Sequence, residues 1–230
     1  MVDIQGLKGR DLKQRVRELL GFSDLVAALQ ELRNLPSRKV INPLFSFLYH
    51  TDDLVRWHAV TATGVVVADL ADKDRESARV ILRRIMWNLN DESGGIGWGS
   101  AEAMGEILAC HKGLATEYAS ILISYIRGDG NFQEHELIQR GVLWGIARLA
   151  QEGPELATGA AEPVMPFLKS GDGNARGLAA RIMGLLRVKE AQGLLVELLD
   201  DETAFALYFD RELIKWTVKR AASEALLAIH

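Results

Sequence analysis

The chain has 230 residues, of which 48% are hydrophobic and 25% charged, and its formal net charge is −4. This composition excludes an intrinsically disordered chain, and the acidic balance disfavours a nucleic-acid-binding protein. The single cysteine, Cys110, excludes a disulfide framework and a multi-cysteine zinc site, so we expect a cytoplasmic location. Residues 1–17 contain no apolar signal core, and the apolar run at residues 60–70 is too short to span a bilayer, so no membrane association is expected.

Two helices are expected at the N-terminus, within residues 1–35. Apolar residues at positions 12, 16, 19 and 20 follow a helical spacing that Gly21 ends. Ser23 is expected to cap the next helix, and Pro36 stops it. We expect these two helices to cap the elements that follow.

Residues 36–229 have the pattern of five consecutive pairs of helices. The first helices of the pairs are expected at residues 37–50, 73–90, 113–128, 154–170 and 189–200. The second helices are expected at residues 53–70, 97–111, 133–151, 174–187 and 211–229. An acidic residue precedes each second helix, where its carboxylate can accept the unpaired N–H groups of the helix N-terminus: Asp52, Asp91, Asp129, Asp172 and Asp201.

Four glycines recur in the second helices. Gly64, Gly105, Gly145 and Gly184 are separated by 41, 40 and 39 residues. Self-similarity with a period near forty is typical of stacked helical-pair repeats, in which small residues let neighbouring helices approach closely. No strand alternation of useful length is present. We therefore expect an all-α, right-handed α-solenoid that forms a single domain over residues 1–230.

Two segments resemble a known repeat family. Val55–Gly64 (VRWHAVTATG) and Ala175–Gly184 (ARGLAARIMG) resemble the HEAT repeat, in particular the short variety of phycobilisome lyases with its Val-Arg-x-x-Ala-Ala pattern closing on Gly. The resemblance extends over residues 36–229, and it also links the chain to bacterial HEAT-like proteins of similar length. It implies the fold but no particular activity. The central pairs depart from the pattern, with Ile96-Gly97 and Glu136-Leu137 at the Val-Arg positions, and such departures indicate where function is to be sought.

The resemblance also implies which residues line a concave groove. Carried over to this chain, the groove positions of the second helices give seven candidate binding residues: Trp57, His58, Trp98, Glu102, Glu106, Gln139 and Arg181. Trp57 and Trp98 occupy equivalent places on neighbouring helices, so they form either an exposed anchor for a partner or part of the core. We expect a non-enzymatic protein-interaction scaffold whose groove carboxylates favour a basic helical or extended partner segment.

Two enzymatic alternatives remain open at this stage. Trp57, Trp98 and Glu102 are similar in kind to the groove residues of alkylpurine DNA glycosylases, which implies an enzyme acting on a nucleobase or small ligand in the groove. Deoxyhypusine hydroxylase holds iron with several His-Glu pairs, of which this chain has one, His135-Glu136. The groove lacks the basic surface that DNA requires, and one pair does not make an iron site. No catalytic residue, metal ligand or cofactor is predicted.

Three local features have alternative interpretations. The glycine-rich stretch Gly94–Gly99 is either a ligand contact or a wide turn between helices. Cys110, beside His111, is expected to be a buried structural cysteine. The aromatic run at residues 204–209 either covers the terminal repeat or forms a homodimer contact through Phe205, Tyr208 and Phe209.

Overall fold

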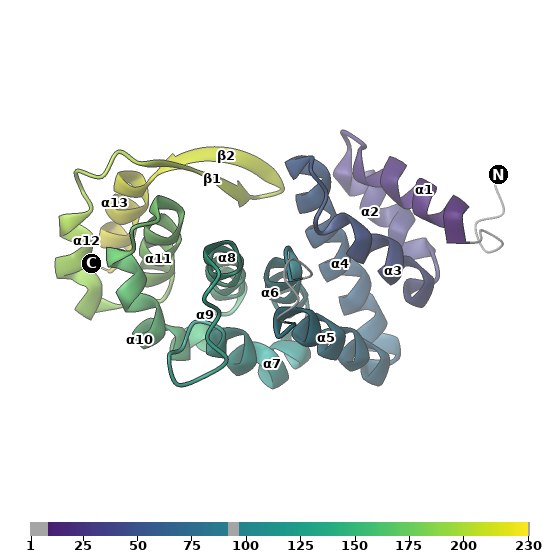
Figure 1. Ribbon diagram of the computed structural model, residues 1–230, viewed down its shortest axis with the longest axis horizontal. Helices are drawn as coiled ribbons and strands as arrows, with labels where there is room; N and C mark the ends of the chain where they lie inside the picture. Colours follow the sequence, from purple (N-terminus) through teal and green to yellow (C-terminus); the bar gives the residue numbers. More distant parts are fainter. Residues whose placement is uncertain (1–8, 92–96, 230) are drawn as a thin grey trace. The chain divides into compact units, whose positions relative to one another are not determined.

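The computed structural model describes residues 9–91 and 97–229, and most of them are helical (Figure 1). Contacts divide the chain after His111 into two compact units, Met1–His111 (unit 1) and Lys112–His230 (unit 2). The single domain expected over residues 1–230 stays a prediction.

Unit 1 contains the N-terminal helices and two helical pairs. The N-terminal helices are α1 (Gly9–Leu20) and α2 (Leu25–Asn34), and the pairs are α3 (Ser37–Phe47) with α4 (Asp53–Lys73) and α5 (Arg75–Leu89) with α6 (Ser100–Cys110). These helices confirm the predicted order. The caps differ in two places: Asp24 and not Ser23 caps α2, and α6 begins after Gly99 and not after Asp91.

The long helix α4 is the centre of unit 1. Helices α2, α3, α5 and α6 all pack against it, so its side chains are buried on nearly every side. Its first turn is capped as predicted, because the Asp52 carboxylate accepts hydrogen bonds from the backbone N–H groups of Leu54 and Val55. Among the described helices, α4 alone is apolar and long enough to cross a membrane, but 67% of its apolar window is buried in the structure.

Unit 2 contains three further helical pairs with more irregular first helices. Its regular helices are α7 (Lys112–Ser124), α8 (Glu136–Glu152), α11 (Gly173–Leu185), α12 (Gln192–Glu197) and α13 (Val218–Ile229). The helix expected at residues 154–170 is broken into α9 (Pro154–Ala157) and α10 (Ala161–Val164) with intervening 3₁₀ turns. Pro163 and Pro166 lie in this stretch, and proline has no backbone N–H to donate to a helix.

A β-hairpin replaces the start of the last predicted helix. Strands β1 (Ala204–Phe209) and β2 (Glu212–Thr217) are antiparallel, with Phe205 opposite Trp216. The prediction of a helix at residues 211–229 is therefore wrong over its first turns, and so is the expectation that no strand is present. The turn gave no sequence signal, because its central residues, Asp210 and Arg211, have φ values of 48° and 68° that hairpins usually assign to Asn-Gly.

The hairpin packs onto the helices of unit 2. The Phe205 ring lies against Gly177 of α11, where any side chain larger than hydrogen would collide with the ring. The Trp144 indole Nε1 on α8 donates a hydrogen bond to the Tyr208 carbonyl oxygen at 2.9 Å. Phe205 and Tyr208 are buried, and of the three residues expected to form a homodimer contact Phe209 alone is partly exposed. The homodimer stays a prediction.

Two of the four recurring glycines, Gly64 and Gly184, mark close helix contacts, as predicted. A Cβ atom added to Gly64 of α4 would collide with Glu106 of α6. A Cβ atom added to Gly184 of α11 would lie 2.6 Å from the Ala225 Cα on α13. The small residues thus allow the second helices of consecutive pairs to touch almost backbone to backbone.

Candidate interaction sites

Two of the predicted groove residues belong to the core of unit 1. Trp57 is only 8% exposed, and the Arg56 guanidinium lies 5.1 Å from the centre of its ring. His58 is buried, and its Nδ1 lies 2.7 Å from the Leu20 carbonyl oxygen. His58 therefore satisfies a carbonyl at the C-terminal end of α1, where helices leave such groups unpaired.

The two predicted groove carboxylates are also buried. Glu102 lies 3.8 Å from the Arg56 Nη1, and burial raises the pKa of its carboxyl group. Glu106 is buried against Gly64 and accepts a hydrogen bond from the Cys110 Sγ at 3.6 Å. Cys110 is exposed, so the expectation of a buried cysteine is wrong. Neither carboxylate lies on the surface, where it could attract a basic partner.

Trp98 is the predicted residue that the structure leaves exposed, at 45%. The next residue, Gly99, makes this position possible. Its φ is 73°, which favours glycine, and a side chain there would collide with the Leu48 backbone. The close approach of Gly99 to Leu48 brings Trp98 to the end of α3.

Trp98 lines a cavity of about 260 Å³ in unit 1, here named the aromatic pocket. Its other aromatic residues are Phe45 and Tyr49, from α3 and the turn after it, and Trp87 from α5. Tyr49 is 54% exposed and Trp87 is 66% exposed. The remaining lining residues are Asn42, Ser46, Leu48, Arg84, Asn88 and Ser100.

Arg84 is the charged residue of the aromatic pocket. Its guanidinium lies over the Phe45 ring at 4.7 Å from the ring centre and donates to the Asn42 Oδ1 at 2.5 Å. Among the residues that the structure describes, no carboxylate lies within ion-pair distance of Arg84. The side chain is thus held in position by neutral partners, and no described carboxylate compensates its charge.

A second cavity adjoins the aromatic pocket. It measures about 600 Å³, lies between α1 and α3, and shares Asn42 and Ser46 with the aromatic pocket. Three basic side chains line it: Lys13, Arg38 and Lys39. This cavity is here named the basic groove.

The predicted groove residues of unit 2 are engaged within the unit. Gln139 is half-buried, and its Nε2 donates to the Gln133 carbonyl oxygen at 2.7 Å, which anchors the loop before α8. Arg181 lies beneath the hairpin, 4.6 Å from the centre of the Phe209 ring and 5.5 Å from that of Trp216. Burial lowers the pKa of Arg181. Its stacking stabilises the hairpin and leaves little of the side chain for a partner.

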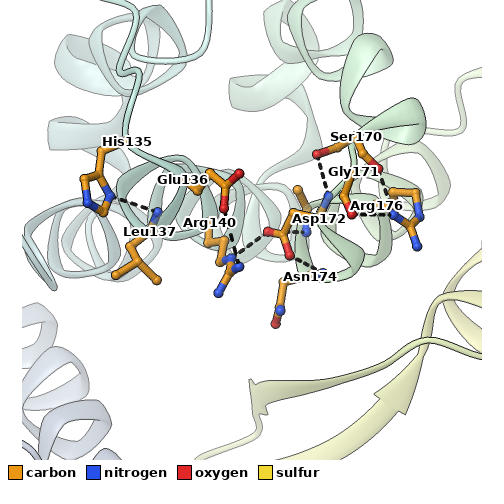
Figure 2. Close-up of polar contacts among 10 residues, drawn as sticks. His135, Glu136, Leu137, Arg140, Ser170, Gly171, Asp172, Asn174 and Arg176 are labelled. Atoms are coloured by element: carbon orange, nitrogen blue, oxygen red, sulfur yellow. Dashed lines mark hydrogen bonds and ion pairs between the residues drawn. The ribbon is translucent and has the colours of Figure 1, made fainter.

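The N-terminal ends of α8 and α11 are joined by a network of polar contacts (Figure 2). Asp172 caps α11 and also accepts a hydrogen bond from the Arg140 Nε of α8 at 2.5 Å. Arg176 donates to the carbonyl oxygens of Ser170 and Gly171 and pairs with Asp201. These charges link consecutive helical pairs, and they are occupied by structural partners.

The remaining sequence candidates are His135-Glu136 and the glycine-rich stretch Gly94–Gly99. His135 does not join Glu136 in a metal site, because its Nδ1 accepts from the Leu137 N–H and caps α8 (Figure 2). No group of three His, Cys, Asp or Glu side chains could hold a metal ion in the described part of the chain. Of the glycine-rich stretch Gly94–Gly99, residues 94–96 lie outside the described residues.

Comparisons with known proteins bear on the fold. No family model matches the chain. A curated protein of Archaeoglobus fulgidus, which carries the name "uncharacterized protein", is 31% identical over 127 residues, covering 54% of this chain and 57% of that protein. The chain thus spans little more than half the length of that relative.

Solved structures resemble nearly the whole chain. An engineered protein solved by the Northeast Structural Genomics Consortium matches with a TM-score of 0.54 at 17% identity, covering 96% of this chain and 97% of that one. A designed armadillo repeat protein in complex with the peptide (KR)4 matches with a TM-score of 0.52 at 17% identity, covering 96% and 100%. The chain has the HEAT/armadillo-like repeat fold. At such low identity the likeness shows the fold alone, and the particular likeness to phycobilisome-lyase repeats stays a prediction.

The aromatic pocket of this repeat protein includes three residues that sequence reasoning missed. Arg84 and Trp87 lie on α5 and Tyr49 follows α3, and both helices are the first of their pair. The groove positions were taken from the second helices alone. A signal was present, since Arg84 and Trp87 are three residues apart and so share one face of a helix. The repeat pattern gave no reason to examine that face.

Proposed function

We propose that the protein is a non-enzymatic, cytoplasmic protein-interaction scaffold whose unit 1 binds an extended segment of a partner protein at the aromatic pocket. The observation that supports this proposal is the distribution of tryptophan. Of the five tryptophans in the chain, Trp57, Trp144 and Trp216 are buried, while the two exposed ones, Trp87 and Trp98, line the same cavity.

Exposed aromatic residues that converge on a cavity can supply binding free energy to a partner. A buried tryptophan or tyrosine removes about 150–250 Å² of surface from water, and these residue types dominate the binding energy of protein interfaces. Scattered exposed apolar residues need no explanation, but a group that shares one cavity does. The pocket is concave, and its lining includes the polar side chains of Asn42, Asn88 and Ser100. These features favour a peptide that buries an apolar side chain and forms hydrogen bonds through its backbone.

This proposal modifies the partner site expected from the repeat pattern. The designed armadillo neighbour was solved with a basic peptide, (KR)4, which is a property of that protein and supports peptide binding as a use of the fold. The expectation of a basic partner for this chain depended on Glu102 and Glu106, which are buried. Groove binding through Gln139 and Arg181 stays a prediction, to which the hairpin contact of Arg181 lends no support.

The test is a selection of peptides from a random library on the full chain, followed by affinity measurement with the selected peptide. We expect Trp87→Ala and Trp98→Ala each to weaken binding by about 30-fold, or about 2 kcal/mol, without lowering the melting temperature. Phe22→Ala is the matched control, because Phe22 is an exposed aromatic residue of unit 1 outside the pocket, and it should leave binding unchanged.

Two results would contradict the proposal. One is that selected peptides bind the Trp87→Ala and Trp98→Ala variants as tightly as the native protein. The other is that the native protein enriches no peptide, although its cooperative unfolding shows that it is folded.

A further inference from the structure

We infer that the partner segment is acidic, with carboxylates placed next to an apolar anchor residue. This inference rests on the proposed function, since it assigns the chemistry of the partner at the same site. It reverses the partner charge that the sequence predicted, and it follows from the charged groups around the aromatic pocket and the basic groove.

Three of the four cations that line the two adjoining cavities have no acidic partner in the described part of the chain. Lys13, Lys39 and Arg84 are exposed, and no carboxylate among the described residues forms an ion pair with any of them. Lys13 lies over the Phe47 ring at 5.7 Å from its centre. Arg38 is different, because it pairs with Asp74. No Asp or Glu is among the described residues that line either cavity, so the surface offers positive charge without internal compensation.

Arg84 is prepared for a carboxylate. Its guanidinium is stacked on Phe45 and bonded to the Asn42 side chain, and these contacts fix its plane next to the aromatic residues. Two parallel N–H groups of an arginine match the two oxygens of a carboxylate, and such pairs are the stronger charge-assisted hydrogen bonds. Because Arg84 needs little ordering on binding, most of that energy is available to the complex.

The spacing along α3 sets the length of the segment. The basic end of this surface is at Lys39 and the aromatic end at Tyr49, ten residues further along the chain. The helical part of this distance, from Lys39 to Phe47, is about 12 Å long at 1.5 Å per residue, and about four extended peptide residues span it at about 3.3 Å each. An acidic stretch of about four residues beside one apolar or aromatic anchor therefore fits the two cavities together.

The experiment compares three labelled peptides on the full chain by fluorescence anisotropy. Each contains a Phe-Pro anchor preceded by four residues, which are all Glu, all Gln or all Lys. We expect the Glu peptide to bind about tenfold or more tightly than the Gln peptide, and the Lys peptide to bind most weakly. The preference for Glu should decrease with added salt, because the cations are exposed.

Two charge variants make the test specific. Arg84→Gln and Lys39→Gln should each reduce the ratio of the affinities for the Glu and Gln peptides about threefold to tenfold. Lys189→Gln is the matched control, because Lys189 is an exposed lysine of unit 2 without an ion pair among the described residues, and it should change nothing.

Distinct results would overturn the inference and the proposed function. Equal affinity for the Glu and Gln peptides, or tighter binding of the Lys peptide, would overturn the acidic partner and leave the aromatic pocket as the peptide site. Tighter binding of a poly(dT) oligonucleotide than of the Glu peptide, sensitive to Trp87→Ala, would replace a protein partner with a nucleic acid. Absence of any binding sensitive to Trp98→Ala would overturn the inference, and the random-library selection would then decide the proposed function separately.

Discussion

The contact between α11 and α13 allows a quantitative test of how the helical pairs are held together. Gly184→Ala adds one methyl group at this contact. Its carbon would lie 2.6 Å from the Ala225 Cα and 2.9 Å from the Ala225 Cβ, whereas carbon atoms in good contact are about 3.5–4.0 Å apart. Since the nearest atom belongs to the backbone, no side-chain rotation relieves the collision, and the two helices must separate by about 1 Å.

The expected effect is the difference between two opposing terms. Alanine in a helix is about 1 kcal/mol more favourable than glycine, whereas forcing an extra methyl group into a filled contact costs about 1–3 kcal/mol. Because the obstruction is backbone, we expect the upper part of that cost and a net loss of about 1–2 kcal/mol in the free energy of unfolding. For a chain of this size that corresponds to a melting temperature lower by about 2–8 °C.

Gly193→Ala is the matched control for this measurement. Gly193 lies in α12 of the same unit, and a Cβ atom added there would meet nothing within 4 Å. The variant should therefore show only the gain in helix propensity, about 0.5–1 kcal/mol, and melt slightly above the native protein. Thermal unfolding followed by circular dichroism measures both. If Gly184→Ala melted at or above the native temperature, close approach of α11 and α13 would be refuted.

Three further perturbations follow from the structure. Glu102→Gln should stabilise the protein at neutral pH relative to the native chain. Burial raises the pKa of Glu102, so the free energy of unfolding of the native chain decreases as the pH rises through that pKa, whereas that of the variant does not. Equal pH profiles of the two proteins in urea unfolding would contradict this. Replacing Asp210-Arg211 by Asn-Gly should raise the unfolding free energy by about 1 kcal/mol, since both positions have positive φ, and an unchanged urea midpoint would count against strain in the turn. Asp172→Ala should lower the free energy of unfolding by about 1–3 kcal/mol, because it removes the cap of α11 and the hydrogen-bond acceptor of the Arg140 Nε, and among the described residues Arg140 then keeps only its ion pair with Glu136 at 4.0 Å. A loss below about 0.5 kcal/mol, the lower limit for removal of a helix cap, would argue against the polar link in Figure 2.

Local pattern accounts for the parts of the fold that were predicted correctly. The order of the helices up to residue 200, the caps at Asp52 and Asp172, and the close contacts at Gly64 and Gly184 depend on residues near one another in the chain or on the repeat itself. The helix expected at residues 154–170 is the exception, because it is broken. The hairpin was not predicted because its turn, Asp210-Arg211, lacks the glycine that is typical of two-residue hairpin turns. Its strands nonetheless contain the aromatic and β-branched residues that favour a sheet.

The candidate site was predicted only in part. Trp98 is exposed and lines a cavity, but Trp57, its counterpart in the repeat, is buried. The repeat register treats the two positions as equivalent, whereas their surroundings differ. Trp98 sits in a turn that Gly99 brings against the end of α3, and Trp57 lies on the central helix α4. Arg84 and Trp87 were not considered because they lie on a first helix.

The amino-acid sequence by itself determined the helical pairs, their period of about forty residues and the small residues at their contacts, because these features depend on local propensity and on spacing along the chain. Only the tertiary structure decided which polar and aromatic side chains are exposed. Exposure depends on which other element covers a residue, so the carboxylates of Glu102 and Glu106 became core groups while Tyr49, Trp87 and Trp98 converged on one cavity. A single sequence carries no direct record of such long-range neighbours.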